Sequence, residues 1–400
     1  MKKGWETKSL AEVCTIKPQK SEARRRLGTG ASVSFVPMED LKVGHKHFDV
    51  PQTRPLESVV GNYTYFADGD VLLAKITPCF ENGKLGIATG LMNGVGFGSS
   101  EFIVLRPTAR LDKDFLYYFL ARPEFRDEGA ARMGGAVGHQ RVPKEFIENC
   151  RIPLPPLAEQ KRIVGVLDEA FAGLAAAKAN AGRNLQNARA VFESYLQAVL
   201  RDKTWQWKTL GDLCDGVEYG SSAKSKKEGK IPVLRMGNVQ DGKLDWSNLV
   251  YTDDEDEIAK YLLKPNDVLF NRTNSLELVG KTAIYKGEMP AIFAGYLIRI
   301  RRREELLDGD FLNYFLNSKL AIDYGRTVAI SSVNQANING AKLKGYPIPA
   351  PSLGEQKAVV SQLDAIRGAT QRLAQCYERK LVALESLKRS LFHQAFSGQL

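Results

Sequence analysis

The sequence has few residues that could form a metal site or a disulfide framework. Its 400 residues include five cysteines at widely separated positions and four histidines. No Cys-x-x-Cys pair occurs, and His45 and His47, two residues apart, have no evident third ligand in their vicinity. Zinc sites and disulfide scaffolds both need closely patterned ligands or paired cysteines. We therefore expect reduced thiols and no metal.

Long apolar runs are also missing. No stretch approaches the roughly 20 apolar residues that span a bilayer, and the first residues lack the apolar core of a signal peptide. We expect a cytoplasmic protein.

No motif of a nucleotide-binding or methyl-transferring enzyme is complete. Gly280-Lys281-Thr282 resembles the end of a P-loop, but Ser275 stands where the first glycine would be. The glycine-rich stretches 94–98 and 134–138 lack the spacing of a dinucleotide-binding loop, and the [DN]-P-P-[FY] motif of amino-methyltransferases does not occur. The sequence therefore predicts no catalytic residues, and residues 280–282 are expected to form a β-hairpin turn.

The charge is positive but evenly spread. The formal net charge is +10, which favours a polyanionic partner. Residues 1–157 carry 22 basic and 18 acidic groups, and residues 205–353 carry 20 and 19. A nucleic-acid surface would therefore require folding to gather basic groups on one face.

The most informative feature is an internal repeat. The segment that begins at Ile152 returns 196 positions later at Ile348, and ten of the seventeen positions up to Asp168 and Asp364 are identical. Weaker similarity extends through both halves, for example between residues 70–75 and 267–272, whereas residues 20–66 and 216–263 share little. The simplest interpretation is a common scaffold with two different surfaces.

Local patterns predict an α+β fold for each copy. Short apolar runs at 70–76, 102–105, 267–272 and 296–300 are typical of strands. Residues 114–121 and 310–317 are expected to form short amphipathic helices with Asp114 and Asp310 as N-caps.

A long helix is predicted after each proline-rich stretch. Apolar residues recur there at steps of three and four, a coiled-coil seam that includes Ile163, Leu167, Leu363 and Leu373. A helix of some forty residues is about 60 Å long and needs a partner for its seam, which its own duplicate can provide. The expected organisation is two mixed α/β domains, 1–157 and 205–353, each followed by a helix, 158–204 and 354–400. The two helices are expected to form an antiparallel coiled coil with pseudo-two-fold symmetry.

This duplication, the I-P-x-P-x-L-x-E-Q-K link into a long helix and the D-V-L-x-x-[KR] strand resemble the specificity (S) subunits of Type I restriction–modification systems, the HsdS family. The resemblance covers essentially the whole chain. One departure is that the first helix ends in Leu196-Gln197-Ala198-Val199-Leu200 and lacks the Phe-Ser-Gly sequence at the end of the second.

The resemblance implies a division of labour. Each globular unit would be a target recognition domain that reads one half of a bipartite, asymmetric site in double-stranded DNA. The helices would set the spacer and dock two modification (M) subunits. This chain would hold no cofactor, while S-adenosylmethionine, ATP and Mg²⁺ would be used by the M subunits and by restriction (R) subunits.

The DNA contacts are predicted around the shared strand and its turn and in the late polar loop of each half, and in the second half also after a proline-bounded strand, because Arg, Lys, Asn and Gln discriminate base edges. In the first half they are Lys75, Thr77, Asn82, Lys84, His139, Gln140 and Arg141. In the second half they are Arg235, Asn238, Asn271, Arg272, Asn274, Lys281, Ser332, Asn334, Gln335 and Asn337.

The repeated link at the helix starts supplies the predicted partner contacts. These residues are Glu159, Gln160, Lys161, Glu355, Gln356 and Lys357. They either dock two identical M subunits or cap the helix starts, where acidic groups favour the helix dipole. Two other functions stay open: a duplicated coiled-coil adaptor that joins proteins without reading DNA, and a stand-alone DNA-modifying enzyme.

Overall fold

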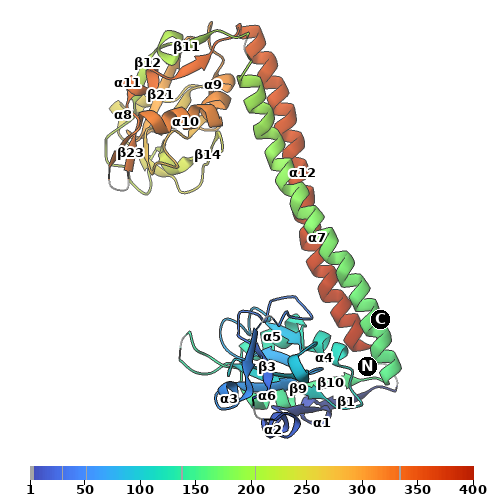
Figure 1. The fold of residues 1–400 in the computed structure, drawn as a ribbon. Helices are drawn as coiled ribbons and strands as arrows, with labels where there is room; N and C mark the ends of the chain where they lie inside the picture. Colours follow the sequence, from blue (N-terminus) through green and yellow to red (C-terminus); the bar gives the residue numbers. More distant parts are fainter. Residues whose placement is uncertain (1–3, 29, 51, 137, 203, 333–334) are drawn as a thin grey trace. The chain divides into compact units, whose positions relative to one another are not determined.

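The computed structural model describes every residue except 1–3, 29, 51, 137, 203 and 333–334. The chain divides into two compact units, residues 1–181 with 379–400 (unit 1) and residues 182–378 (unit 2). Each unit holds one globular domain and part of each long helix, α7 (Leu157–Leu200) and α12 (Leu353–Ser397) (Figure 1). Both helices start one residue before the predicted positions.

The described residues of the globular domain of unit 1 form three sheets. A four-stranded antiparallel sheet has the order β2-β9-β6-β7, a mixed sheet has the order β4-β3-β8-β5 with β3 parallel to β8, and β1 pairs with β10. Their strands are β1 (Glu6–Ser9), β2 (Cys14–Ile16), β3 (Ser32–Val36), β4 (Gln52–Pro55), β5 (Thr64–Ala67), β6 (Val71–Ala74), β7 (Leu85–Ile87), β8 (Val95–Gly98), β9 (Phe102–Pro107) and β10 (Arg151–Leu154). Both faces of β6 are covered, since Val71 and Leu73 pack into one core and Leu72 and Ala74 into another. This explains its unbroken apolar sequence.

Unit 2 repeats the central sheet. The order β12-β21-β17-β19 matches β2-β9-β6-β7, β13 is parallel to β20 as β3 is to β8, and β11 pairs with β24 as β1 does with β10. The strands of unit 2 are β11 (Trp207–Thr209), β12 (Cys214–Tyr219), β13 (Ile231–Leu234), β14 (Val239–Gln240), β15 (Lys243–Leu244), β16 (Val250–Thr252), β17 (Val268–Asn271), β18 (Thr273–Asn274), β19 (Thr282–Ile284), β20 (Ile292–Phe293), β21 (Leu297–Arg302), β22 (Ile330–Ser332), β23 (Gln335–Asn337) and β24 (Pro347–Pro349). The predicted α+β scaffold with two copies is confirmed.

Short helices cover these sheets. They are α1 (Leu10–Val13), α2 (Ser21–Arg26), α3 (Leu56–Val59), α4 (Lys113–Leu120), α5 (Pro123–Ala130) and α6 (Lys144–Asn149) in unit 1, and α8 (Glu255–Tyr261), α9 (Gly309–Leu316), α10 (Lys319–Val328) and α11 (Gly340–Lys344) in unit 2. The predicted N-caps were wrong by two residues. Asp112, not Asp114, caps α4 by accepting the amides of residues 114 and 115, and Asp308, not Asp310, caps α9. The later aspartate of each pair lies in the first turn, where its charge favours the helix dipole.

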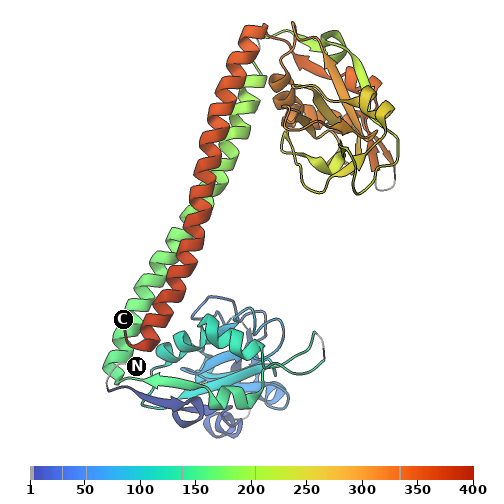
Figure 2. The same ribbon diagram turned by 180° about the vertical axis from the view of Figure 1, so that it is seen from behind.

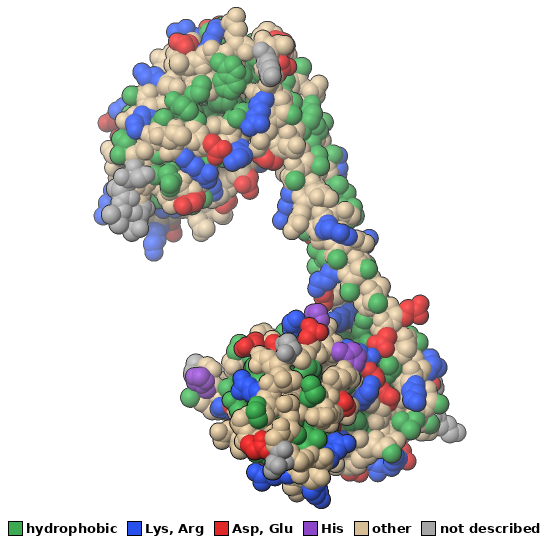
Figure 3. All heavy atoms as spheres, in the orientation of Figure 1, with side chains coloured by type: hydrophobic (Ala, Val, Ile, Leu, Met, Phe, Trp, Pro, Cys, Tyr) green, Lys and Arg blue, Asp and Glu red, His purple; other side chains and the backbone are tan. Residues whose placement is uncertain are grey.

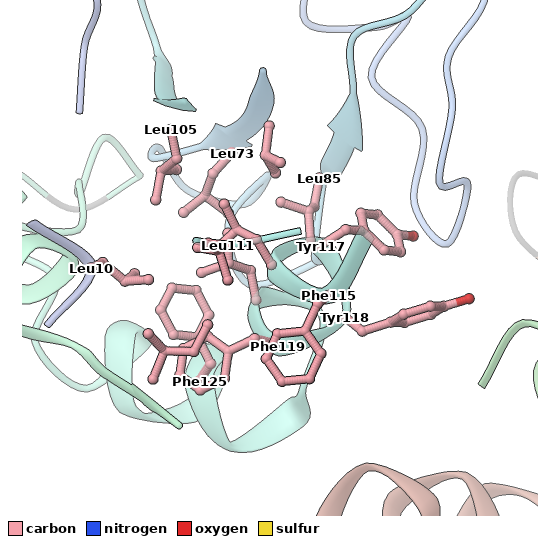
Figure 4. Packing of buried hydrophobic residues seen from close by; sticks show 14 of the residues in the cluster. Leu10, Leu73, Leu85, Leu105, Leu111, Phe115, Tyr117, Tyr118, Phe119 and Phe125 are labelled. Atoms are coloured by element: carbon pink, nitrogen blue, oxygen red, sulfur yellow. The ribbon is translucent and has the colours of Figure 1, made fainter. Parts of the chain in front are cut away.

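The largest core of unit 1 contains residues from both ends of the sequence. Leu73 and Leu105 from the strands face Phe115 and Phe119 from α4 (Figure 4). Phe396, near the end of α12, lies with its ring centroid 5.0 Å from that of Phe115 and 5.5 Å from that of Phe119. The last turns of α12 therefore complete the core of the first domain.

The long helices lie side by side in both ribbon views (Figures 1 and 2). In unit 1 the pairing is antiparallel, because Phe171 packs on Phe392 at 4.8 Å and Arg162 donates to Leu400 O at 2.7 Å. Unit 2 has contacts of the same sense. One expected seam residue was wrong: Leu373 is 44% exposed. A straight α-helix drifts relative to a 3.5-residue seam, which moves such a position out of the contact.

Candidate nucleic-acid interface

In unit 1, four predicted DNA contacts lie together where β6 ends. Lys75 follows β6 directly, and residues 76 and 141 form a β-bridge. The amide of Thr77 donates to the carbonyl of Gln140 at 3.0 Å, which places Arg141 beside the strand end. His139 adjoins this group and is exposed. The glycine-rich loop and the shared strand therefore contribute to one surface.

Glu101 holds the two cations of this group in place. Arg141 donates from Nε and Nη2 to the two carboxylate oxygens of Glu101, both at 2.9 Å, and Lys75 Nζ lies 3.9 Å from Oε2. The hydrogen bonds from Arg141 hold the pKa of Glu101 below its usual range, although burial opposes this. Arginine and lysine have five and three donors, so both can also bind an outside acceptor.

A cavity of about 420 Å³ opens beside these residues. Its described lining contains no acidic side chain, and its five cations are Lys17, Lys20, Lys75, Arg141 and Lys144. Burial, reinforced by the neighbouring cations, lowers the pKa of Lys20, as expected in a positive potential. The lining of the cavity also includes the aromatic residues Tyr63, Tyr65 and Phe102. Such a hollow suits a phosphate next to an apolar or base surface.

Two further predictions in unit 1 fall outside this group. Lys84 is half-buried, and its ammonium donates to Met38 O at 2.8 Å, so it ties down the loop after β3. Asn82 is exposed in the turn before Lys84 and stays a prediction.

In unit 2, a cavity of about 560 Å³ brings together Arg235, Asn238, Asn274 and Lys281. Lys281 Nζ donates to Gln240 Oε1 at 3.0 Å, which adds an amide to the group. Segment 272–281 closes the β17–β19 hairpin, with Gly280 N donating to the carbonyl of residue 271. A hairpin turn, and not a phosphate-binding loop, explains the Gly-Lys-Thr sequence.

Three exposed residues in the lining of this second cavity were missed. Met236, Leu278 and Tyr296 present apolar or aromatic surface next to the polar groups. They come from three separate segments, so no periodicity in the sequence could have shown that they converge. Such side chains suit contact with a thymine methyl group or a base face.

Two predicted base-reading residues of unit 2 were wrong. Asn238 is buried, and its Nδ2 donates to the carbonyls of Asp245 and Ser247 at 2.9 and 3.0 Å, so it supports the loop from inside. Asn271 is fully buried at the end of β17, at the position that Ala74 occupies in β6. Both side chains point into the protein, where they cannot reach a base.

The other predicted residues of unit 2 that the structure describes lie around the β18-β23-β22 sheet. Arg272 places its guanidinium carbon 4.8 Å from the ring centroid of Tyr219, and Asn337 Nδ2 donates to Thr273 Oγ1 at 2.7 Å. Gln335 is exposed in β23. The backbone of Ser332 belongs to β22, and Asn334 lies outside the described residues.

Charged side chains of both signs are interspersed over the visible face (Figure 3). Among the described residues, no group of three or more His, Cys, Asp or Glu side chains could hold a metal ion, and none of the described helices is long and apolar enough to cross a membrane. Because charges of both signs are interspersed on the surface, the cluster of cations around the first cavity is a local feature.

A family model for the Type I restriction modification DNA specificity domain matches residues 2–181 and 202–376. The chain belongs to this family. The specificity subunit of the EcoEI restriction enzyme from Escherichia coli is 39% identical over 167 residues, which are 42% of this chain and 27% of that subunit. The EcoKI specificity subunit from Escherichia coli strain K12 is 25% identical over 315 residues, covering 74% and 68% of the two chains.

Solved structures share the fold. The HsdS subunit from Thermoanaerobacter tengcongensis superimposes with a TM-score of 0.69 at 20% identity, covering 100% of this chain and 98% of that one. A chain from a structure of type I restriction–modification complex assembly gives a TM-score of 0.77, also at 20% identity, covering 100% and 99%. The match to the first curated relatives is shorter, since the chain spans 27% of the length of the first two.

Two of the predicted partner contacts were wrong. Gln160 and Gln356 are fully buried. Gln160 Oε1 accepts the amide of Asp112 at 2.8 Å, and its Nε2 donates to the carbonyls of Arg110 and Pro155 at 2.9 and 2.8 Å. Gln356 makes the same three contacts, 196 residues later, at 2.8, 2.8 and 2.9 Å. These amides attach each long helix to its domain and are not available to a partner.

The remaining four residues of the repeated link differ in their surroundings. Glu355 accepts the amide and hydroxyl of Ser352 and so caps α12, while Glu159 pairs with Arg162. Lys161 and Lys357 are exposed. The lysines keep the accessibility that a docking surface needs, and they stay predictions.

Proposed function

We propose that this chain is the non-catalytic DNA-reading subunit of a type I restriction–modification complex. Each globular domain reads one half of a bipartite, asymmetric site in double-stranded DNA. The cations bind DNA phosphates and so contribute affinity that falls as the salt concentration rises. The polar and apolar groups around each cavity discriminate bases.

One observation carries this proposal: the same strand, β6 in one unit and β17 in the other, leads into two unlike polar surfaces. Lys75 and Arg141 border a cation-lined cavity in unit 1. Arg235, Gln240 and Lys281 border a more polar one in unit 2. A common scaffold with two different surfaces is what two unlike half-sites require.

Two M subunits dock at equivalent positions of the repeated helix starts, with Lys161 and Lys357 as the exposed contacts. Adenine methylation with S-adenosylmethionine belongs to those subunits, and ATP- and Mg²⁺-dependent cleavage belongs to R subunits. This chain contributes the recognition of the DNA site and sets the length of the spacer between its two halves.

Methylome sequencing of the host, with and without the gene for this chain, tests the proposal. The expected result is one bipartite methylated motif that disappears on deletion and returns on complementation. A duplicated adaptor without DNA readout predicts no change in methylated motifs and no steep salt dependence of DNA binding. Methyl transfer by the purified chain alone would instead show a stand-alone enzyme.

A further inference from the structure

A second contact ties each long helix to its domain, close to the buried glutamine. The hydroxyl of Tyr118 on α4 donates to Asp168 on α7, and the hydroxyl of Tyr314 on α9 donates to Asp364 on α12 at 2.5 Å. Burial, and then the neighbouring carboxylate, raises the pKa of both tyrosines, so each remains a protonated donor at neutral pH. Figure 4 shows the hydroxyl of Tyr118 pointing away from the core residues around it. The contact therefore recurs in both units.

In unit 1 a third element joins this contact. Lys46, in the loop between β3 and β4, lies 2.8 Å from Asp114 on α4 and 2.8 Å from Asp168 on α7. Burial would lower the pKa of Lys46, but its hydrogen bonds to the two carboxylates outweigh this effect and raise it. A loop of the recognition domain, its short helix and the long helix thus meet at one charged group.

In unit 2 different residues connect three corresponding elements, namely the β14–β15 turn, the short helix α9 and the long helix α12. Arg367 on α12 donates from Nη2 to Asp241 O at 3.0 Å, and its guanidinium carbon lies 5.3 Å from the ring centroid of Tyr314. Asn313 on α9 donates to Gly242 O at 2.8 Å. The β14–β15 turn is therefore fixed to both helices, although no residue here corresponds to Lys46. The same arrangement is reached with unrelated side chains.

We propose that these two junctions determine the spacer of the DNA site by fixing the direction in which each long helix leaves its recognition domain. Junction 1 consists of Gln160, Tyr118, Asp168 and Lys46, and junction 2 of Gln356, Tyr314, Asp364 and Arg367. The inference rests on the proposed function and adds positioning residues that act on the spacer and not on the half-sites.

The geometry of a long lever explains why the junctions matter. A helix of 45 residues is roughly 67 Å long at 1.5 Å per residue. Base pairs are about 3.4 Å apart along DNA. A rotation of only about 3° at the base of such a helix moves its far end by one base-pair rise. Helix length alone therefore cannot set a spacer to one base pair unless the exit angle is also fixed.

The test compares Tyr314→Phe, Tyr118→Phe and Asp364→Ala with the parent chain, expressed with the host's own methyltransferase, by methylome sequencing. Tyr285→Phe is the matched control, since its buried hydroxyl also makes one hydrogen bond, to Met289 O at 2.9 Å, away from both junctions. For Tyr314→Phe and Asp364→Ala, each of which removes this hydrogen bond, we expect methylation at spacers one base pair longer or shorter to rise about fivefold or more, with both half-sites unchanged. The rise is smaller for Tyr118→Phe, because Lys46 still holds Asp168.

The possible outcomes separate the two proposals. Methylation over a wider range of spacer lengths in the junction variants, and not in Tyr285→Phe, supports the inference. An unchanged spacer, or methylation that falls equally at all spacers, overturns it and leaves the proposed function intact. A parent chain that yields no bipartite motif overturns the proposed function. Circular dichroism of each purified variant shows whether it is folded, and Asp364→Ala provides the answer if Tyr314→Phe does not fold.

Discussion

Replacing Gln160 with alanine removes three hydrogen bonds from the start of α7, one of them buried and two partly buried, and leaves their backbone partners without this side chain. The affected groups are the amide of Asp112 and the carbonyls of Arg110 and Pro155. A buried polar group left without a partner costs about 1–3 kcal/mol. Contributions at one site are not additive and water can enter the space, so we expect a loss of about 2–4 kcal/mol in the local stability of this region.

Hydrogen exchange measures this loss at the site. The amide of Asp112 donates directly to Gln160 Oε1, so its exchange should accelerate by roughly 30- to 1000-fold, the equivalent of about 2–4 kcal/mol. Gln356→Ala should do the same at Asp308 and leave Asp112 unchanged, because the two amides lie in different compact units. Lys161→Ala serves as the control, because Lys161 is the next residue in the chain and is exposed.

Two results would refute the reasoning. Acceleration below about threefold at Asp112 would mean that water replaces the glutamine without loss. Equal acceleration at Asp112 and Asp308 in either variant would mean that the two units do not respond separately.

Three further predictions concern packing, pH and specificity. Gly98→Ala should lower the free energy of unfolding by about 1–3 kcal/mol in urea titrations, because the new Cβ would lie 2.3 Å from the backbone carbonyl of Val36; Gly61→Ala, with no atom within 4 Å, should be near neutral. Burial raises the pKa of Glu218, but hydrogen bonds from Arg299 and Arg301 outweigh burial and lower it. The ionised carboxylate therefore stabilises the folded chain fully above about pH 4.3, and this stabilisation is lost as the pH falls. In Glu218→Gln the free energy of unfolding should depend less on pH in the acid range. Arg235→Ala should relax the methylated motif at one position of one half-site and cost about 1–3 kcal/mol of discrimination there, whereas uniform weakening across sequences would indicate a phosphate contact.

The sequence was sufficient to predict the scaffold because the scaffold depends on apolar patterns. The run around Val71 and the run around Val268 are unbroken, since each strand is covered on both faces, and the repeat shows that the two runs are equivalent. The prediction failed for Asn271, because residue type was considered without the face of the strand. The alanine at the equivalent position 74 was a signal that this position belongs to the core.

Gln160 shows a different limit of sequence reasoning. A glutamine in the first turn of a helix resembles an exposed docking residue, and only the fold places the partly buried amide of Asp112 beside it. A signal was present, since Asp112 and Asp308 are 196 residues apart, as are the two glutamines. The repeat therefore contained both ends of the contact, but no local pattern linked them.

The chemistry of the junctions explains how the two recognition surfaces can diverge while the helix exits stay alike. Gln160 and Gln356 bind only backbone atoms, so residue 110 can be arginine and residue 306 leucine without altering the contact. The loops around Lys46 and Asp241 differ in sequence, yet each is attached to the short and the long helix. In unit 1 the side chain of Lys46 makes the attachment, whereas in unit 2 side chains of Arg367 and Asn313 on the helices donate to backbone carbonyls of the loop. If the exit angle sets the spacer, a recognition loop can change freely only while it keeps such an attachment. A loop substitution that alters base preference should then leave the spacer unchanged, and one that removes the attachment should alter the spacer without altering the bases read.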